Sequence, residues 1–393
     1  MKPVSNTPDW VLAALDERRQ GNLMRQVVTL DSPQVPHTQI QGQAYTAYCS
    51  NDYLGLANHP YLIKAMQSCA SEYGVGGGAS HLVSGHLGVH QALEEALADW
   101  LGYQRVMLFS TGYMANLGVI SALASKQRPV VQDKLNHASL IDGAQLAQAP
   151  LRRYLHADAA SAEQRMRKEL QSGLLVTDGV FSMDGDIAPL DKLSSLAEQL
   201  DWTLMVDDAH GLGCLGAQGR GSLALYNLGM QQVPILVGTF GKAFGTAGAF
   251  VATNNDFADY LTQFARPYIY TTSMSPATAG ASLAALELIC SDEGQQRREV
   301  LAEHIVYFRQ RMSDLPVDLM PSKTGIQPIV IGDSATALAV SEQLKASAIW
   351  CTAIRPPTVP KGKARLRITL SAGHSKQDLV LLCDALERVL TAK

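Results

Sequence analysis

Two stretches decide the fold, Leu204-Met205-Val206-Asp207-Asp208-Ala209-His210 and, further along, Thr239-Phe240-Gly241-Lys242. The first begins with an apolar run, the second directly follows one, and each stretch carries polar residues at the end of the strand. Short apolar runs of this kind are typical of buried parallel strands. The predicted strands cover residues 106–109, 129–131, 174–176, 204–206, 235–237 and 249–251. Amphipathic stretches between them predict helices, so the pattern indicates an α/β domain with a mostly parallel central sheet.

The pattern changes near residue 288. Helices are predicted over residues 90–101, 162–171, 190–200 and 277–290, and a charged stretch at 291–298 is interpreted as a break before a long helix. Beyond it, strands are expected at 326–331 and 364–369, with helices at 335–346 and 375–390. We therefore predict three parts. They are an N-terminal arm (1–45) with a helix over 9–21 followed by coil, a large α/β domain (46–288), and a smaller α+β domain (289–393).

The composition excludes several classes of protein. The 393 residues are 47% hydrophobic and carry a net charge of -4, which argues against a disordered chain and against a basic nucleic-acid-binding face. The longest apolar stretch contains Lys242, which argues against a membrane span. None of the six cysteines forms a CxxC pair or has a histidine at zinc-ligand spacing, so we expect buried thiols in a reducing compartment and no bound metal. Together with the absence of a signal-peptide pattern, this predicts a cytoplasmic protein.

Two glycine motifs point to nucleotides and fail on closer inspection. Residues 211–216 match G-x-G-x-x-G, but no acidic residue lies between Asp208 and Asp256 to bind a ribose. Gly241-Lys242 is followed by Ala243, where a P-loop needs Ser or Thr to hold Mg²⁺. Nicotinamide and nucleoside-triphosphate chemistry are therefore disfavoured.

Three residues at strand ends suggest a different chemistry. Lys242 stands among small residues, and an apolar setting lowers the pKa of a lysine, as Schiff-base chemistry requires. Asp207 ends an apolar strand, where a carboxylate can keep a pyridine nitrogen protonated. His210 could hydrogen-bond a ring hydroxyl. Each residue alone is more commonly structural, but ligands of open α/β sheets bind at the carboxyl ends of strands, where all three occur.

The spacing Asp207-x-Ala209-His210 with Thr239-x-x-Lys242 resembles the fold-type I pyridoxal-phosphate (PLP) enzymes, and more narrowly the α-oxoamine synthases. The resemblance extends over nearly the whole chain, and its motifs lie at residues 50–56, 180–186, 264–266, 270–274 and 352–360. It implies an aspartate-aminotransferase-like fold and PLP as cofactor. The segment 352–360 further implies decarboxylative condensation of L-alanine with a pimeloyl thioester, as in biotin biosynthesis. The alternative is an α-oxoamine synthase that uses glycine and another acyl-CoA.

The resemblance also implies a role for each matching residue. Lys242 would bind the cofactor and move the α-proton, Asp207 would pair with the pyridine nitrogen, and His137 would stack on the ring. The other implied cofactor contacts are Gly112, Tyr113, Ser182, His210, Thr239, Thr271 and Thr272. The implied substrate contacts are Arg25, Asn51, Arg355 and Thr358. Thr271 and Thr272 resemble residues donated to a neighbouring subunit, which implies a homodimer with shared active sites.

Three positions depart from the family pattern. Ala79 and His81 stand in a glycine-rich loop where relatives often have Gly and Arg, and Asp178 stands where Glu is also common. The first two bear on recognition of the acyl chain or its carrier, while Asp178 keeps the carboxylate. The sequence leaves open whether the acyl group arrives on coenzyme A or on an acyl carrier protein.

Overall fold

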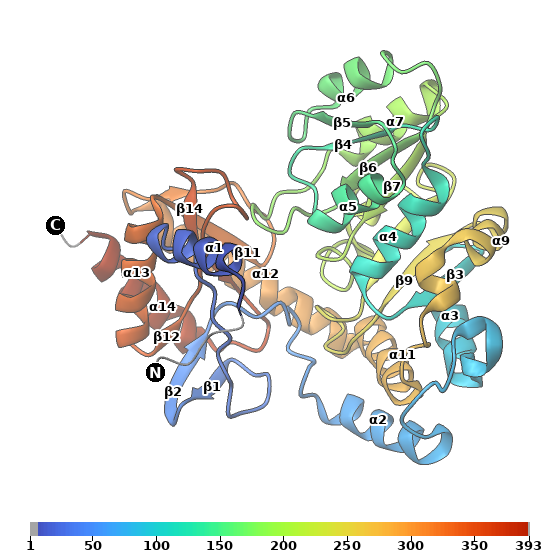
Figure 1. Cartoon of the computed structure of the whole chain (residues 1–393). Helices are drawn as coiled ribbons and strands as arrows, with labels where there is room; N and C mark the ends of the chain where they lie inside the picture. Colours follow the sequence, from blue (N-terminus) through green and yellow to red (C-terminus); the bar gives the residue numbers. More distant parts are fainter. Residues whose placement is uncertain (1–6, 392–393) are drawn as a thin grey trace.

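The computed structural model describes residues 7–391, which form two lobes connected by the long helix α12 (Asp292–Ser313) (Figure 1). The larger lobe is built on a seven-stranded sheet with the order β3-β9-β8-β7-β6-β4-β5. The smaller lobe contains a four-stranded sheet, β10-β11-β14-β13, and a three-stranded sheet, β1-β2-β12. The predicted α/β architecture with a mostly parallel central sheet is confirmed.

Six strands of the large sheet run in one direction. The seven strands are β3 (Arg105–Phe109), β4 (Val130–Asp133), β5 (Leu151–Tyr154), β6 (Leu174–Asp178), β7 (Thr203–Asp207), β8 (Ile235–Thr239) and β9 (Ala249–Thr253). The expectation that β9 is parallel is wrong, because β9 pairs antiparallel with both β8 and β3. The link from β8 to β9 is too short for a crossover helix, so the chain can only turn back on itself. The edge strand β5 was missed, because two exposed arginines interrupt its apolar pattern.

Both faces of the large sheet are buried, which explains the continuous apolar runs of its strands. Leu175 and Val206 face one hydrophobic core, while their neighbours Val176 and Met205 face the other. The helices and helical turns of this lobe are α2 (Pro60–Tyr73), η1 (His81–Gly85), α3 (Gly88–Leu101), α4 (Gly112–Leu123), α5 (Ala138–Leu146), α6 (Ala159–Met166), α7 (Leu190–Gln199), η2 (Ala217–Gly219), α8 (Ser222–Leu225), α9 (Asn255–Phe264), α10 (Arg266–Tyr270) and α11 (Pro276–Cys290).

The smaller lobe combines both ends of the chain. Its C-terminal elements are β10 (Asp318–Leu319), β11 (Ile326–Gly332), α13 (Ser334–Ala346), β12 (Ile349–Trp350), β13 (Ala353–Ile354), β14 (Ala364–Thr369) and α14 (Lys376–Thr391). The hairpin of β1 (His37–Ile40) and β2 (Gln43–Ala47) pairs with β12, so part of the stretch expected as coil is a strand. Distant pairing of this kind leaves no local signal in a short polar segment.

The charged stretch 291–298 is not a break, and that expectation is wrong. Ser291 caps α12 by accepting a hydrogen bond from the Gly294 amide, and the charges that follow form the first turns of this helix. Arg297 and Glu293 form an ion pair of 2.7 Å one turn apart, which supports an exposed helix face.

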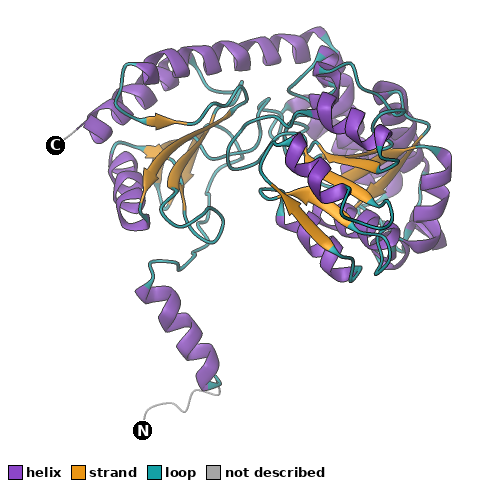
Figure 2. Ribbon diagram, turned by 90° about the horizontal axis from the view of Figure 1, so that it is seen from above, coloured by secondary structure: helices purple, strands orange, loops and turns teal. Residues whose placement is uncertain are grey.

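Helix α1 (Asp9–Gln20) projects away from the body of the protein (Figure 2). None of its residues is buried, and the Trp10 side chain is 74% exposed. Over residues 7–391, no helix combines the length and the apolar character that crossing a bilayer requires.

Candidate active site

The polar ends of the parallel strands meet at one edge of the large sheet. Asp178 and Asp207 end β6 and β7 and are paired partners in the register, and Thr239 ends the next strand, β8. Lys242 and His137 follow closely after β8 and β4. A cavity of about 190 Å³ opens at this edge. It is lined by Gly112, Tyr113, Asn116, His137, Asp178, Val180, Ser182, Asp207, Ala209, His210, Thr239 and Lys242.

Lys242 heads a chain of hydrogen-bonding groups. Its Nζ lies 2.7 Å from His210 Nε2, and His210 Nδ1 lies 2.6 Å from the Tyr53 hydroxyl. Tyr53 donates to Asn51 Oδ1 (3.3 Å), and Arg367 donates to the same oxygen (3.1 Å). With Asn51 Oδ1 as the final acceptor, Tyr53 accepts from His210 Nδ1, and Nε2 is left as the acceptor facing Lys242.

The surroundings of Lys242 favour its neutral form. Burial lowers the pKa of the Lys242 ammonium to about 8, although the nearby carboxylates of Asp207 and Asp178 act in the opposite direction. Burial and the neighbouring ammonium hold the pKa of His210 well below its usual range. The site therefore presents a buried amine that is partly deprotonated near neutral pH, next to a neutral imidazole.

Asp207 is held rigidly at the floor of the cavity. Asn116 Nδ2 donates to its Oδ2 (2.6 Å), and the Ala209 amide donates to its Oδ1 (3.1 Å). Asn116 also donates to Ser139 Oγ (2.9 Å), which is bonded to His137 Nδ1 (2.7 Å). One amide side chain thus positions both the carboxylate and, through Ser139, the imidazole of His137.

Two more carboxyl groups lie close by, Asp178 in the cavity lining and Asp208 next to Asp207 in the sequence. Burial, followed by repulsion from Asp207, raises the pKa of Asp178 above its usual range, and its Oδ2 accepts the His137 amide (3.1 Å). Burial raises the pKa of Asp208 to about 7 even though the Ser222 amide donates to it. A Cβ on Gly211 would lie 2.2 Å from Asp208 Oδ1. The glycine of the G-x-G-x-x-G match therefore makes room for this carboxyl group rather than for a pyrophosphate.

The cavity also contains a helix start that is suited to an anion. Helix α4 begins at Gly112 directly after β3, with Thr111 Oγ1 accepting from the Met114 amide (3.1 Å). The first amides of a helix have no partner within it and attract negative charge. Thr239 lies nearby, but its hydroxyl donates to the Gly248 carbonyl (3.0 Å) and accepts from the Gly241 amide.

The remaining sequence-predicted residues lie outside the cavity lining. Arg25 donates to Thr358 Oγ1 (3.5 Å), and Arg355 donates to the backbone carbonyls of Asn22 and Met24 (3.3 Å to the latter). The three residues thus cluster with the N-terminal arm.

Two further predicted residues lie after α10. Thr272 bridges to Ser80, and its carbonyl accepts from Ser110 Oγ (3.4 Å), while Thr271 precedes it. Neither threonine lines the cavity of its own chain.

Three site residues were missed as functional residues by the sequence reasoning. Asn116 follows Gly112 by one helical turn, so its position on the α4 face toward the sheet was a usable signal. Tyr53 lies inside the family motif at residues 50–56, but no role was assigned to it. Arg367 donates from β14 to the Ser182 carbonyl (2.6 Å), and no local pattern marked it.

The residues present fit PLP. The cavity offers an amine for the aldehyde, a fixed carboxylate for the pyridine nitrogen and a helix N-terminus for the phosphate. Two buried atoms at its wall, Asn116 Oδ1 and Asp178 Oδ1, have no hydrogen-bond partner within residues 7–391, so polar groups of a ligand can satisfy them. Fold and site together define a PLP-dependent enzyme of the α/β type.

Comparison with known proteins agrees with this class. The sequence model of the family described as aminotransferase class I and II matches residues 45–386. The 8-amino-7-oxononanoate synthase of Marinomonas sp. (strain MWYL1) is 76% identical over 393 residues, which cover 100% of this chain and 98% of that protein. The 8-amino-7-oxononanoate synthase of Pseudomonas putida (strain GB-1) is 56% identical over 374 residues and 95% of each chain.

Solved structures agree as well. A serine palmitoyltransferase of Sphingomonas wittichii superimposes with a TM-score of 0.91 at 28% identity, over 99% of this chain and 98% of that chain. An 8-amino-7-oxononanoate synthase of Francisella tularensis gives a TM-score of 0.76 at 32% identity, over 88% and 96%. The chain belongs to the aminotransferase class I and II family and, within it, to the 8-amino-7-oxononanoate synthases. It is an enzyme, and its cofactor is PLP.

Proposed function

We propose that this enzyme condenses L-alanine with a pimeloyl thioester to give 8-amino-7-oxononanoate, CO₂ and the free thiol carrier, a step of biotin biosynthesis. The observation that carries the proposal is that Lys242 and Asp207 line the same cavity. The chain is also 76% identical to an 8-amino-7-oxononanoate synthase. The new carbon–carbon bond joins the alanine α-carbon to the thioester carbonyl, and the alanine carboxylate leaves as CO₂.

The proton at the alanine α-carbon is the central problem of this reaction. PLP, when bound, supplies an electron sink for the charge left at that carbon. Lys242 Nζ removes and returns the proton, and a pKa near 8 suits a group that must act as both base and acid at neutral pH. Asp207, fixed by Asn116, would stabilise the positive charge of the pyridine nitrogen, and His137 would cover the ring.

The substrate carboxylate needs a cation, and Arg355 is the proposed partner. A guanidinium binds a carboxylate through two parallel hydrogen bonds. In the present arrangement Arg355 donates to the carbonyls of Asn22 and Met24, so substrate binding has to exchange these neutral acceptors for a carboxylate. Arg25 and Thr358 lie in the same cluster, whereas Asn51 accepts from Tyr53 at the end of the Lys242 chain.

The assembly belongs to the same proposal. Thr271 and Thr272 lie outside their own cavity, which supports their donation to the phosphate site of a second copy in a homodimer. Gly112, Tyr113 and Thr239 would hold the phosphate within the chain, and Ser182 and His210 would hold the ring. A cytoplasmic location rests on the six cysteines, which are unpaired; the expectation that they are buried is wrong except for Cys351 and Cys383.

Two measurements test the proposal. Steady-state turnover is compared for L-alanine and glycine, with pimeloyl-coenzyme A, pimeloyl-acyl carrier protein and acetyl-coenzyme A in parallel. Preference for L-alanine with a pimeloyl donor is expected, and preference for glycine with acetyl-coenzyme A would contradict it. Lys242→Ala should abolish turnover and the visible absorbance of covalently bound cofactor, whereas the exposed control Lys126→Ala should retain both. An active Lys242→Ala enzyme would sink the site assignment.

A further inference from the structure

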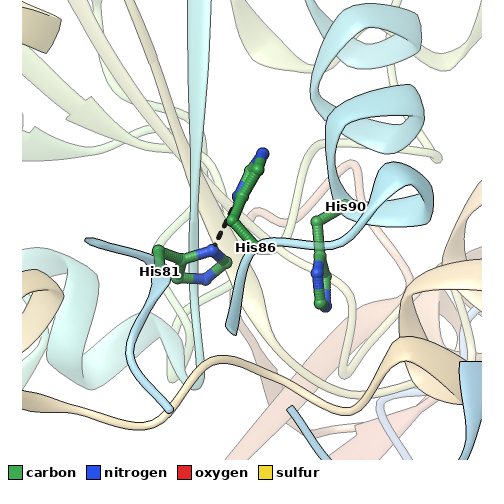
Figure 3. Close-up of side chains that lie close together, drawn as sticks. All are labelled: His81, His86 and His90. Carbon is green, nitrogen blue, oxygen red and sulfur yellow. Dashed lines mark hydrogen bonds between the residues drawn. The ribbon is translucent and has the colours of Figure 1, made fainter. Parts of the chain in front are cut away.

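Three histidines converge at the start of α3 (Figure 3), and none of them lines the active-site cavity. His81 begins the turn η1, His86 follows it, and His90 lies in the first turn of α3. Their ring centroids lie 5.1 Å (His81–His86), 5.4 Å (His81–His90) and 5.8 Å (His86–His90) apart. One nitrogen of each ring lies within 4.8 Å of the corresponding atoms of the other two.

We propose that His81, His86 and His90 bind a divalent transition-metal ion, with Zn²⁺ as the best fit. A tetrahedral zinc ion with Zn–N bonds of about 2.0–2.1 Å places the centroids of its imidazole ligands about 5.2 Å apart. The His81–His86 separation is slightly shorter than this value, and the other two separations are slightly longer. Small side-chain rotations that open the His81–His86 contact (2.9 Å) and draw in the third nitrogen complete the site.

The hydrogen bonds of His90 define which atom it offers to the ion. Its Nδ1 accepts from the Leu87 amide (3.0 Å), so Nε2 carries the proton and donates to the Met274 carbonyl (2.9 Å). A metal ion replaces that proton at Nε2, while the Leu87 contact keeps the ring oriented, as second-shell contacts do in known zinc sites. Burial, followed by repulsion between the rings, lowers the pKa of His81 to about 3, so this ring is a neutral ligand.

The site also has an entry path. His81 and His86 are only half-buried, so an ion can reach them from solvent. Glu94 Oε2 lies 3.9 Å from His86 Nε2, but burial raises the pKa of Glu94 to about 8, so this group supplies no carboxylate ligand near neutral pH. Three neutral imidazoles leave the fourth position of a tetrahedral zinc ion to water.

A metal ion here would tie the turn η1 to the first turn of α3. The His81 ring stacks on Tyr268 with centroids 5.2 Å apart, and Ser80, next to His81, bridges to Thr272. The ion would therefore fix the loop that contacts the 268–272 segment, in exchange for the hydrogen bond from His90 Nε2 to the Met274 carbonyl. The sequence-based expectation of no bound metal weighed cysteine spacings and did not consider these three histidines together.

The test uses PLP-loaded enzyme that has been treated with a chelator, freed of chelator and dialysed against Zn²⁺. Bound zinc per chain and the thermal unfolding midpoint are measured for the wild type, His86→Ala and the control His37→Ala, whose histidine is exposed in the other lobe. One retained zinc per chain and a zinc-dependent rise of the midpoint are expected for the wild type and for His37→Ala. Both should be lost in His86→Ala.

The proposal is overturned if the wild type retains no zinc, or if His86→Ala retains as much as the wild type. His86→Gln, which keeps a polar side chain beside Gln91, replaces His86→Ala if the alanine variant does not fold. The cofactor absorbance of each variant, measured without zinc, shows that the enzyme is folded before metal is added.

Discussion

The amine of Lys242 should titrate near pH 8, and two charge changes should move that value in opposite directions. Burial lowers the pKa of Lys242 from 10.5 to about 8, Asp207 opposes the shift, and Arg367 adds to it. Asp207→Asn removes a negative charge and keeps the contact with Asn116, so the pKa should fall further. Arg367→Gln removes a positive charge, so the pKa should rise. A change of about one pH unit is expected in each case.

The size of the effect follows from the two pKa values. At pH 7.5 a lysine with a pKa near 8 is about one quarter neutral, whereas an ordinary lysine is about one part in a thousand neutral. The structure therefore raises the concentration of the nucleophilic amine about 240-fold. Since only the neutral amine attacks a carbonyl carbon, capture of the cofactor depends on this fraction.

Competitive labelling of the cofactor-free enzyme measures this titration. A trace acylating reagent is applied between about pH 6.5 and 10.5, and mass spectrometry compares the Lys242 peptide with that of the exposed Lys126. A wild-type midpoint at the ordinary lysine value would refute the role of burial. Shifts of Asp207→Asn and Arg367→Gln in the same direction would refute the electrostatic reasoning.

Two further predictions concern stability. Burial alone would lower the pKa of His156, but hydrogen bonds to Asp133 (3.1 Å) and Asp186 (2.9 Å) outweigh it and raise the pKa to about 10. The ion pairs stabilise the fold fully below pH 6.5, the unfolded value, and are lost as the pH rises through 10. His156→Asn should therefore cost about 3 kcal/mol in urea unfolding at pH 6, and less at pH 10.5. Gly238→Ala places a Cβ 2.4 Å from the Phe250 ring and should cost about 1–3 kcal/mol in the same assay.

Each of these variants has a clear contrary outcome. A His156→Asn deficit that grows above pH 10 would contradict the ion-pair explanation. Gly229→Ala is the matched glycine control, because a Cβ there meets nothing within 4 Å, and its effect should stay below about 0.5 kcal/mol. Equal losses for the two glycine variants would show that crowding against Phe250 is not the cause.

Much of the fold and the centre of the site could be predicted from local pattern. A strand buried on both faces is apolar throughout, and its carboxyl end is marked by the first polar residue after the run. Asp207 and Lys242 were found in this way, and the structure brings them together in one cavity. The cofactor and the family were implied by the resemblance of these and further motifs along the chain to a known family.

Contacts between distant segments could not be predicted in this way. The reversal of β9 depends on the length of a loop and on its pairing with β3, which precedes it by many elements. Arg367 reaches Asn51 across 316 residues of sequence, and its partners become visible only once the two lobes are in place.

The sequence by itself determined the α/β class and the strand-end chemistry, because these depend on neighbours within one strand and its following turn, and its motifs resembled the family along nearly the whole chain. Only the tertiary structure decided that Asn116 fixes Asp207, that Arg355 contacts the N-terminal arm, and that three histidines converge beside α3. Such contacts leave no repeating pattern in the sequence, because hydrogen-bond partners come together only after the strands and helices have packed.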